Sequence, residues 1–152
     1  MSIENIQNSV EYVRVHGEMY LPSDSRPLAD KLLLQLASDA ITLGVTDIAV
    51  IKQSGWIFVG SDCDWLQCGG FRPATIRELF FRVIPLLEAG QNSIRHEIVV
   101  NAFSEKVVIF SKDELIAIGG ICEFEEKYLT DVFRILDKAR AIAFLSLSEA
   151  KS

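Results

Sequence analysis

A length of 152 residues fits a single domain that can bury a hydrophobic core of its own. Hydrophobic residues make up 49% of the chain and charged residues 24%, which excludes an intrinsically disordered protein. The formal net charge of -6 disfavours nucleic acid and anionic membrane surfaces as partners. We find neither a signal-peptide pattern nor an apolar run long enough to span a membrane, and three cysteines are too few for a disulfide framework. We therefore expect a cytoplasmic protein.

The first half of the chain predicts a helix, a hairpin and a second helix. Apolar residues recur at i, i+4 spacing over residues 27–43, which is typical of an amphipathic helix that ends at Gly44. Two strand-like runs, 47–52 and 56–60, are joined by a short turn with a glycine and predict a β-hairpin. A capping-box pattern then opens a predicted helix over residues 75–88.

The second half predicts three strands and a last helix. Strand-like runs at 95–103, 106–110 and 114–118 are separated by tight turns, and helical spacing resumes near Glu123. The order α-β-β-α-β-β-β-α predicts an α+β fold with a five-stranded antiparallel sheet flanked by helices. We divide the chain into an N-terminal extension (1–25), a single α+β domain (26–145) and a polar tail (146–152).

No group of residues matches a known catalytic pattern. Asp62, Cys63, Asp64 and Cys68 form the densest group of metal-ligand types, but no second Cys or His pair at short spacing accompanies them. The sequence contains no nucleophile elbow, P-loop or dinucleotide-binding fingerprint. We therefore predict a non-enzymatic protein without a metal or cofactor.

The segment predicted as the second helix is unusually apolar. It contains more apolar side chains than one face of a sheet can cover, since a helix on a sheet needs only one apolar stripe. Two covers are open at this stage: the N-terminal residues 1–21, or a second protomer. The residues that produce this excess are Ile76, Leu79, Phe80, Phe81, Val83, Ile84, Leu86 and Leu87.

The predicted element order resembles that of the Roadblock / dynein light chain family over about residues 26–142. Residues 48–59 are similar to the first hairpin of that family, because an apolar run, a polar turn with glycine and a second apolar run follow one another. Residues 95–100, 106–110 and 115–118 are similar to its three-stranded meander. The turn at residues 52–54 departs from the family pattern, which usually has an acidic residue there.

The resemblance implies a homodimer in which the second helix and third strand form the interface. It further implies a scaffold or a regulator of a small Ras-like GTPase. Carried over by position, the interface residues are Leu79, Phe80, Val83, Ile84, Leu87, Arg95, Glu97, Val99 and Asn101.

Two other functions remain open from the sequence. A small acidic inhibitor, such as a bacterial immunity protein, would bind its partner through an acidic face, and a secretion chaperone, also small, acidic and dimeric, is a further alternative. That face would consist of Asp62, Asp64, Glu123, Glu125 and Glu126. A small-molecule sensor would use a pocket lined by aromatic residues, for which Trp56, Trp65 and Phe71 are the candidates.

Overall fold

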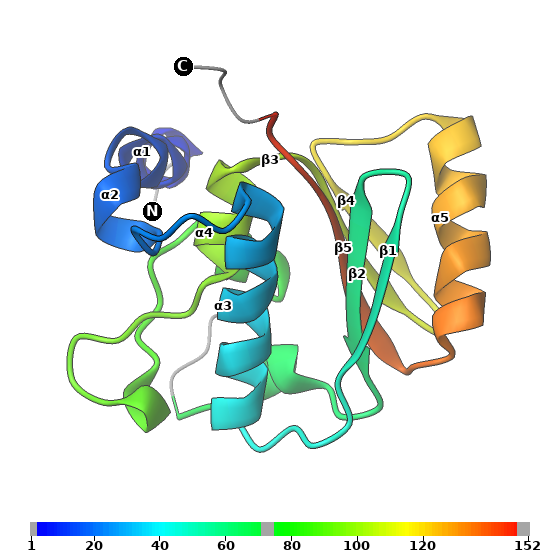
Figure 1. Ribbon diagram of the computed structural model, residues 1–152, viewed down its shortest axis with the longest axis horizontal. Helices are drawn as coiled ribbons and strands as arrows, with labels where there is room; N and C mark the ends of the chain where they lie inside the picture. Colours follow the sequence, from blue (N-terminus) through cyan, green and yellow to red (C-terminus); the bar gives the residue numbers. More distant parts are fainter. Residues whose placement is uncertain (1–2, 71–74, 149–152) are drawn as a thin grey trace.

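The computed structural model describes residues 3–70 and 75–148 and shows an α+β fold built on one antiparallel sheet (Figure 1). The strands are β1 (Ala49–Gln53), β2 (Trp56–Ser61), β3 (Ser104–Ser111), β4 (Leu115–Ile118) and β5 (Arg140–Ser146). Their order across the sheet is β1-β2-β5-β3-β4. The predicted fold class, with five antiparallel strands and flanking helices, is confirmed at this level.

Helices cover both faces of the sheet. Helix α5 (Glu123–Leu136) lies alone on one face, and on the other lie α1 (Ile3–Val15), α2 (Gly17–Tyr20), α3 (Leu28–Thr42) and α4 (Glu97–Ala102) (Figure 1). Side chains alternate along each strand, so that neighbouring residues enter different cores. In β2, for example, Phe58 packs under α5 while Ile57 and Val59 pack in the core on the side of α3 and α4.

The predicted hairpin is confirmed, and its turn shows why it forms. Gln53 pairs with Trp56, which leaves a two-residue turn of Ser54 and Gly55. Both turn residues have positive φ, at 54° and 84°. This conformation matches the right-handed twist of the two strands, and glycine adopts it without steric cost.

The predicted helix over residues 75–88 is wrong. The described part of this segment contains two short 3-10 turns, Arg77–Phe80 and Leu87–Ala89, separated by irregular backbone. Pro85 cannot donate an intrahelical hydrogen bond, and it pairs instead with Ile94 in an isolated antiparallel bridge. The apolar side chains around it belong to an irregular, largely buried segment.

The predicted strand over residues 95–103 is also wrong, because most of it forms helix α4. Its β-branched residues favour a strand locally, but their burial in the helical layer decides the outcome. The fifth strand of the sheet is β5 instead, which we did not predict. It begins after Asp137, whose left-handed conformation at φ 54° ends α5. The strand predicted at 106–110 and the one at 114–118 are confirmed as β3 and β4.

Candidate functional site

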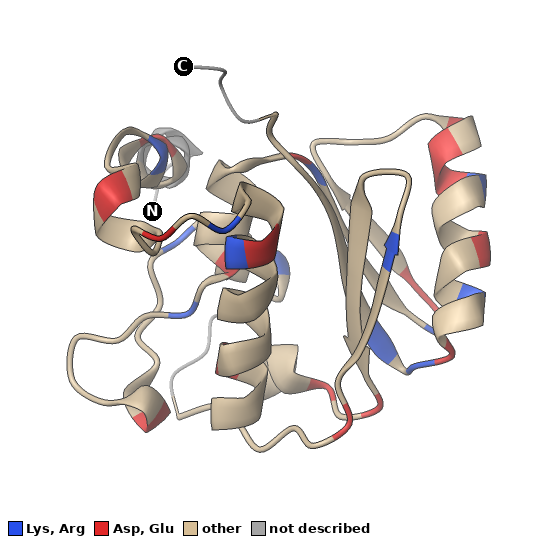
Figure 2. Ribbon diagram, viewed as in Figure 1, with Lys and Arg blue, Asp and Glu red and all other residues tan. Residues whose placement is uncertain are grey.

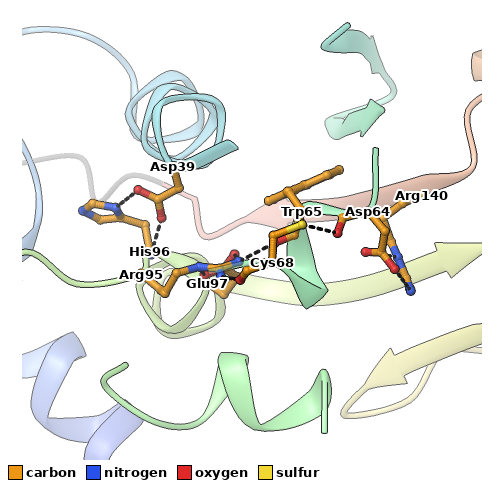
Figure 3. Close-up of polar contacts among 8 residues, drawn as sticks. All are labelled: Asp39, Asp64, Trp65, Cys68, Arg95, His96, Glu97 and Arg140. Carbon is orange, nitrogen blue, oxygen red and sulfur yellow. Dashed lines mark hydrogen bonds and ion pairs between the residues drawn. The ribbon is translucent and has the colours of Figure 1, made fainter. Parts of the chain in front are cut away.

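A buried ion pair stands at the start of α4, between Arg95 and Glu97 (Figure 3). Both side chains are fully enclosed. The guanidinium donates through Nη2 to Glu97 Oε2 at 2.7 Å and through Nε to Oε1 at 3.2 Å. This two-bond geometry fixes the relative orientation of the side chains as well as neutralising them.

The same guanidinium holds the loop that follows β2. Arg95 donates through Nη1 to the carbonyl of Cys68 at 3.2 Å and through Nη2 to the carbonyl of Trp65 at 3.3 Å. Burial raises the pKa of Glu97 above its ordinary value, although the neighbouring Arg95 opposes this shift. The pair therefore joins α4 to a distant loop at a substantial desolvation cost.

A second polar pair, Asp39 with His96, lies beside the first (Figure 3). The buried carboxylate of Asp39, on α3, accepts the backbone N–H of His96 at 2.6 Å. Its other oxygen contacts Nδ1 of the imidazole at 2.8 Å. Asp39 thus satisfies a backbone donor at the beginning of α4 and also fixes the plane of the His96 ring.

A pocket of about 480 Å³ opens against this second pair. Among the described residues that line it, none is Lys or Arg, and Asp39 is the one carboxylate. Its wall combines hydroxyl and amide groups with apolar side chains. The lining residues are Met19, Tyr20, Ser38, Asp39, Thr42, Val83, Leu86, Ala89, Asn92, Ser93, Ile94 and His96.

Exposed apolar side chains surround the mouth of this pocket. Met19 is 63% exposed and Val83 is 44% exposed, and both line the pocket. Val83 also lines a neighbouring hollow with Leu87, which is 61% exposed. We call Met19, Val83 and Leu87 the apolar rim. Because Val83 belongs to both hollows, the rim is one continuous surface.

Most of the predicted interface residues lie inside the chain. Leu79, Phe80, Ile84 and Val99 are buried in the core, and Arg95 and Glu97 form the ion pair described above. Asn101 donates its side-chain amide to the carbonyl of Phe80 at 2.8 Å. Only two of the nine, Val83 and Leu87, are exposed to a substantial degree.

The N-terminal helix α1 covers part of the buried core that contains Leu79, Phe80 and α4. Val13 of α1 is completely buried, and α1 packs on α4. Arg14 adds a hydrogen bond from Nε to the carbonyl of Ala102 at 2.8 Å. The sequence left open what covers the apolar residues 76–87. Of these, Leu79, Phe80 and Ile84 share one buried core with Val13, so that the N-terminal segment contributes to that cover.

The predicted acidic face is divided between the two ends of α5 (Figure 2). Glu123, Glu125 and Glu126 belong to its first turn, whereas Asp62 lies beyond its last turn and accepts the backbone N–H of Ala139. A helix of 14 residues separates the two groups by about 20 Å.

Three members of this acidic set are also paired with a cation, and Asp62 lies 3.7 Å from Nζ of Lys138. Asp64 accepts two hydrogen bonds from Arg140, at 2.9 and 3.0 Å. Glu125 is paired with Lys106, and this hydrogen bond is the main reason that the pKa of Glu125 lies below its ordinary value. The five residues therefore form no continuous acidic surface.

The loop with Cys63 and Cys68 contains two free thiols. Cys68 donates to the carbonyl of Asp64 at 3.2 Å. Partial desolvation, followed by the neighbouring Cys68, raises the pKa of Cys63. Within residues 3–70 and 75–148, no three His, Cys, Asp or Glu side chains are grouped so that they could hold a metal ion.

The aromatic residues proposed for a sensor pocket do not meet. Trp56 is buried under α5, and Trp65 is buried in the core on the opposite face of the sheet. Phe71 lies outside the described residues. The pocket beside His96 contains neither tryptophan.

Sequence reasoning missed Asp39 and the role of His96. One signal was available, because Asp39 follows Leu32 and Leu36 on the buried stripe of α3. An acidic residue at a buried position of an amphipathic helix requires a polar partner. The sequence alone does not show that this partner is His96, which is 57 positions away in the chain.

No family model, characterised protein or solved structure matches this chain. The Roadblock resemblance therefore remains a prediction. Among the described residues, none of the helices has the length and apolar character needed to cross a bilayer. The class that fold and site define is an α+β domain with a polar pocket and an apolar rim on its multi-helix face.

Proposed function

We propose that this chain is a non-enzymatic protein-binding domain whose contact surface is the apolar rim, and that a second copy of the chain occupies this surface. The observation that supports the proposal is the exposure of Met19, Val83 and Leu87 around two adjoining hollows. Exposed apolar patches of this kind mark protein interaction sites, because water otherwise covers them unfavourably.

The charge distribution favours a second copy as the partner. The whole chain carries a net charge of -6, so that two copies repel each other over most of their surface. The described residues that line the two hollows include one carboxylate, Asp39, and that group is buried and already bonded to His96. A symmetric contact at the rim would therefore bring the apolar groups of the two hollows together, with the exposed Glu18 and Glu88 next to Met19 and Leu87 in the chain.

The more specific predictions made from the sequence belong to this proposal. A homodimer of the Roadblock type, with a Roadblock or profilin-like fold and a Ras-like GTPase as its target, rests on the sequence resemblance. Of the interface implied by that resemblance, Val83 and Leu87 are the members able to contact another chain. A dimer that uses them would therefore be built on the irregular segment before α4.

Light scattering coupled to size exclusion tests the proposal, from low micromolar to submillimolar concentration. We expect the wild-type chain to dimerise, and Leu87→Glu or Met19→Glu to shift the equilibrium to the monomer. Both side chains are exposed, so that neither change disturbs the core. A buried glutamate pair at a two-fold contact would be strongly unfavourable.

Phe124→Glu is the matched control, because Phe124 is 80% exposed on α5, across the sheet from the rim. This variant should dimerise as the wild type does. A wild-type chain that stays monomeric throughout the range would overturn the proposal. Equal weakening by Phe124→Glu and Leu87→Glu would show that net charge, and not the rim, controls association.

A further inference from the structure

We infer that the pocket beside His96 is a binding site for a small molecule that carries a hydrogen-bond donor, neutral or cationic, on a short apolar group. The pocket is formed by a single chain, so that the inference does not depend on self-association. Its volume of about 480 Å³ falls within the range of about 300–1,000 Å³ that is typical of ligand sites.

The Asp39 carboxylate decides which hydrogen-bonding group the pocket presents. In the neutral imidazole, the contact of Nδ1 with Asp39 places the proton on Nδ1 and leaves Nε2 as an acceptor. Figure 3 shows the second ring nitrogen on the side of the ring away from Asp39. No hydrogen bond to Nε2 forms within the described part of the chain, and His96 lines the pocket.

The contact between Asp39 and His96 does more than satisfy a backbone donor at the start of α4. The backbone N–H of His96 is satisfied by one carboxylate oxygen, which would be sufficient as a helix cap. The second oxygen orients the imidazole ring. The partly exposed His96 side chain (27%) is therefore held by the buried carboxylate of Asp39 (3%). A fixed acceptor at the edge of a pocket is the arrangement by which binding sites select donors.

The remaining wall determines the rest of the ligand. Ser38, Thr42 and Ser93 add hydroxyl groups, which can donate or accept. Met19, Val83 and Leu86 form an apolar side that fits a short alkyl group. Within residues 3–70 and 75–148, no Lys or Arg lines the pocket and Asp39 is the one carboxylate, so that a ligand anion would find no counter-charge from these residues.

The chain contains only two histidines, His16 and His96, which allows a direct test. Long-range proton–nitrogen-15 NMR spectra would follow both imidazoles while butylamine, butanol or butyrate is added. These probes share one alkyl chain and differ in charge. We expect saturable shifts of the His96 Nε2 signal with butylamine and butanol, no such shift with butyrate, and unchanged His16 signals.

Variants assign the effect to the ring. His96→Gln should weaken binding of the two donors about tenfold, the loss expected for one hydrogen bond in a buried site. His16→Gln should leave binding unchanged, because His16 lies outside the pocket and stacks on Tyr12. If the wild type dimerises, the same titration is made on Leu87→Glu, whose altered side chain lies outside this pocket.

Three results would overturn the inference. They are read on the wild type if it is monomeric and on Leu87→Glu if the wild type dimerises, because Met19 and Val83 belong both to this pocket and to the rim that a second copy would cover. The first is the absence of saturable shifts with every probe. The second is butyrate binding as tightly as butylamine. The third is equal movement of both histidine signals, which would indicate a general solvent effect. These spectra, from a chain with His96 intact, give the three outcomes even if His96→Gln fails to fold.

Discussion

The two faces of the sheet are covered in different ways. On one face, α5 supplies the whole cover, with Leu129, Val132, Phe133 and Leu136 in one stripe. Aromatic rings continue this core, as Phe110 stacks on Phe133 with centroids 4.8 Å apart. The outer side of α5 carries charges of both signs (Figure 2).

On the other face, several short elements share the cover and polar groups hold them in place. Arg95 joins α4 to the loop after β2, and Asp39 joins α3 to the start of α4. Hydrophobic contact has no preferred direction, whereas hydrogen bonds fix orientation. In this molecule a single amphipathic helix covers its face with an apolar stripe, whereas the composite cover is also held by buried polar pairs.

The largest expected effect concerns the buried pair of the composite face. Glu97→Gln leaves the Arg95 charge buried without its counter-ion, and we expect the free energy of unfolding to fall by about 3–5 kcal/mol. Urea denaturation would measure it. Glu125→Gln is the matched change on the α5 side, where the pair with Lys106 is partly exposed, and should cost far less. Equal losses would remove the proposed difference between the faces.

A substitution under α5 tests how closely that helix packs. A Cβ at Gly60 would lie 2.6 Å from Leu136 Cδ2 and 3.0 Å from the carbonyl of Arg140. We expect Gly60→Ala to destabilise the protein by about 1–3 kcal/mol through overpacking. Thermal unfolding would measure this loss of stability. The double variant with Leu136→Ala removes the clash with Leu136, but the clash with the Arg140 carbonyl remains, so that the loss due to that clash should not be recovered. An unchanged midpoint in Gly60→Ala would mean that α5 and β2 are loosely packed.

Two valines of α1 test whether this helix is an essential part of the composite cover. Val13 is fully buried, whereas Val15 is 66% exposed. Val13→Ala removes two buried methyl groups and should cost about 1–2 kcal/mol. Val15→Ala should leave the urea midpoint nearly unchanged. The same small effect from both variants would show that α1 is detached from α4 in solution.

The smallest effect concerns the exposed pair beside α5. The hydrogen bond from Lys106, followed by the backbone N–H of Cys122, holds the pKa of Glu125 below its ordinary value. A carboxyl whose pKa is lowered by folding adds stability above its unfolded pKa, and that stability is lost as pH falls through the folded pKa. Lys106→Gln should move the Glu125 pKa part of the way back, because the Cys122 contact remains. NMR titration that finds the same pKa in both proteins would contradict the assignment.

Prediction from sequence succeeded where a local pattern is sufficient. The boundaries of α3 and the start of α5 follow from apolar spacing, and the Ser54-Gly55 turn follows from the backbone conformation that it requires. Each of these elements can be recognised from its own residues, because it is amphipathic or contains a distinctive turn sequence.

Prediction failed in the segment between β2 and β3, and the candidate site lies there. Locally, the apolar side chains around Phe80 favour a helix and the β-branched run of α4 favours a strand. In the fold, the first segment forms short 3-10 turns and the second a buried helix. Of the site residues, the sequence indicated Val83 and Leu87 as contact residues and gave no indication of the pairing of Asp39 with His96.

By itself, the sequence determined an acidic α+β domain and four of its five strands, since composition and periodicity are properties of the chain alone. Only the tertiary structure decided which apolar residues are covered and which carboxylate meets which base. The physical reason is distance along the chain: Asp39 and His96 are 57 residues apart, and Arg14 and Ala102 are 88 apart. Contacts of that separation leave no periodic trace in the sequence and form only when the helices pack on the sheet.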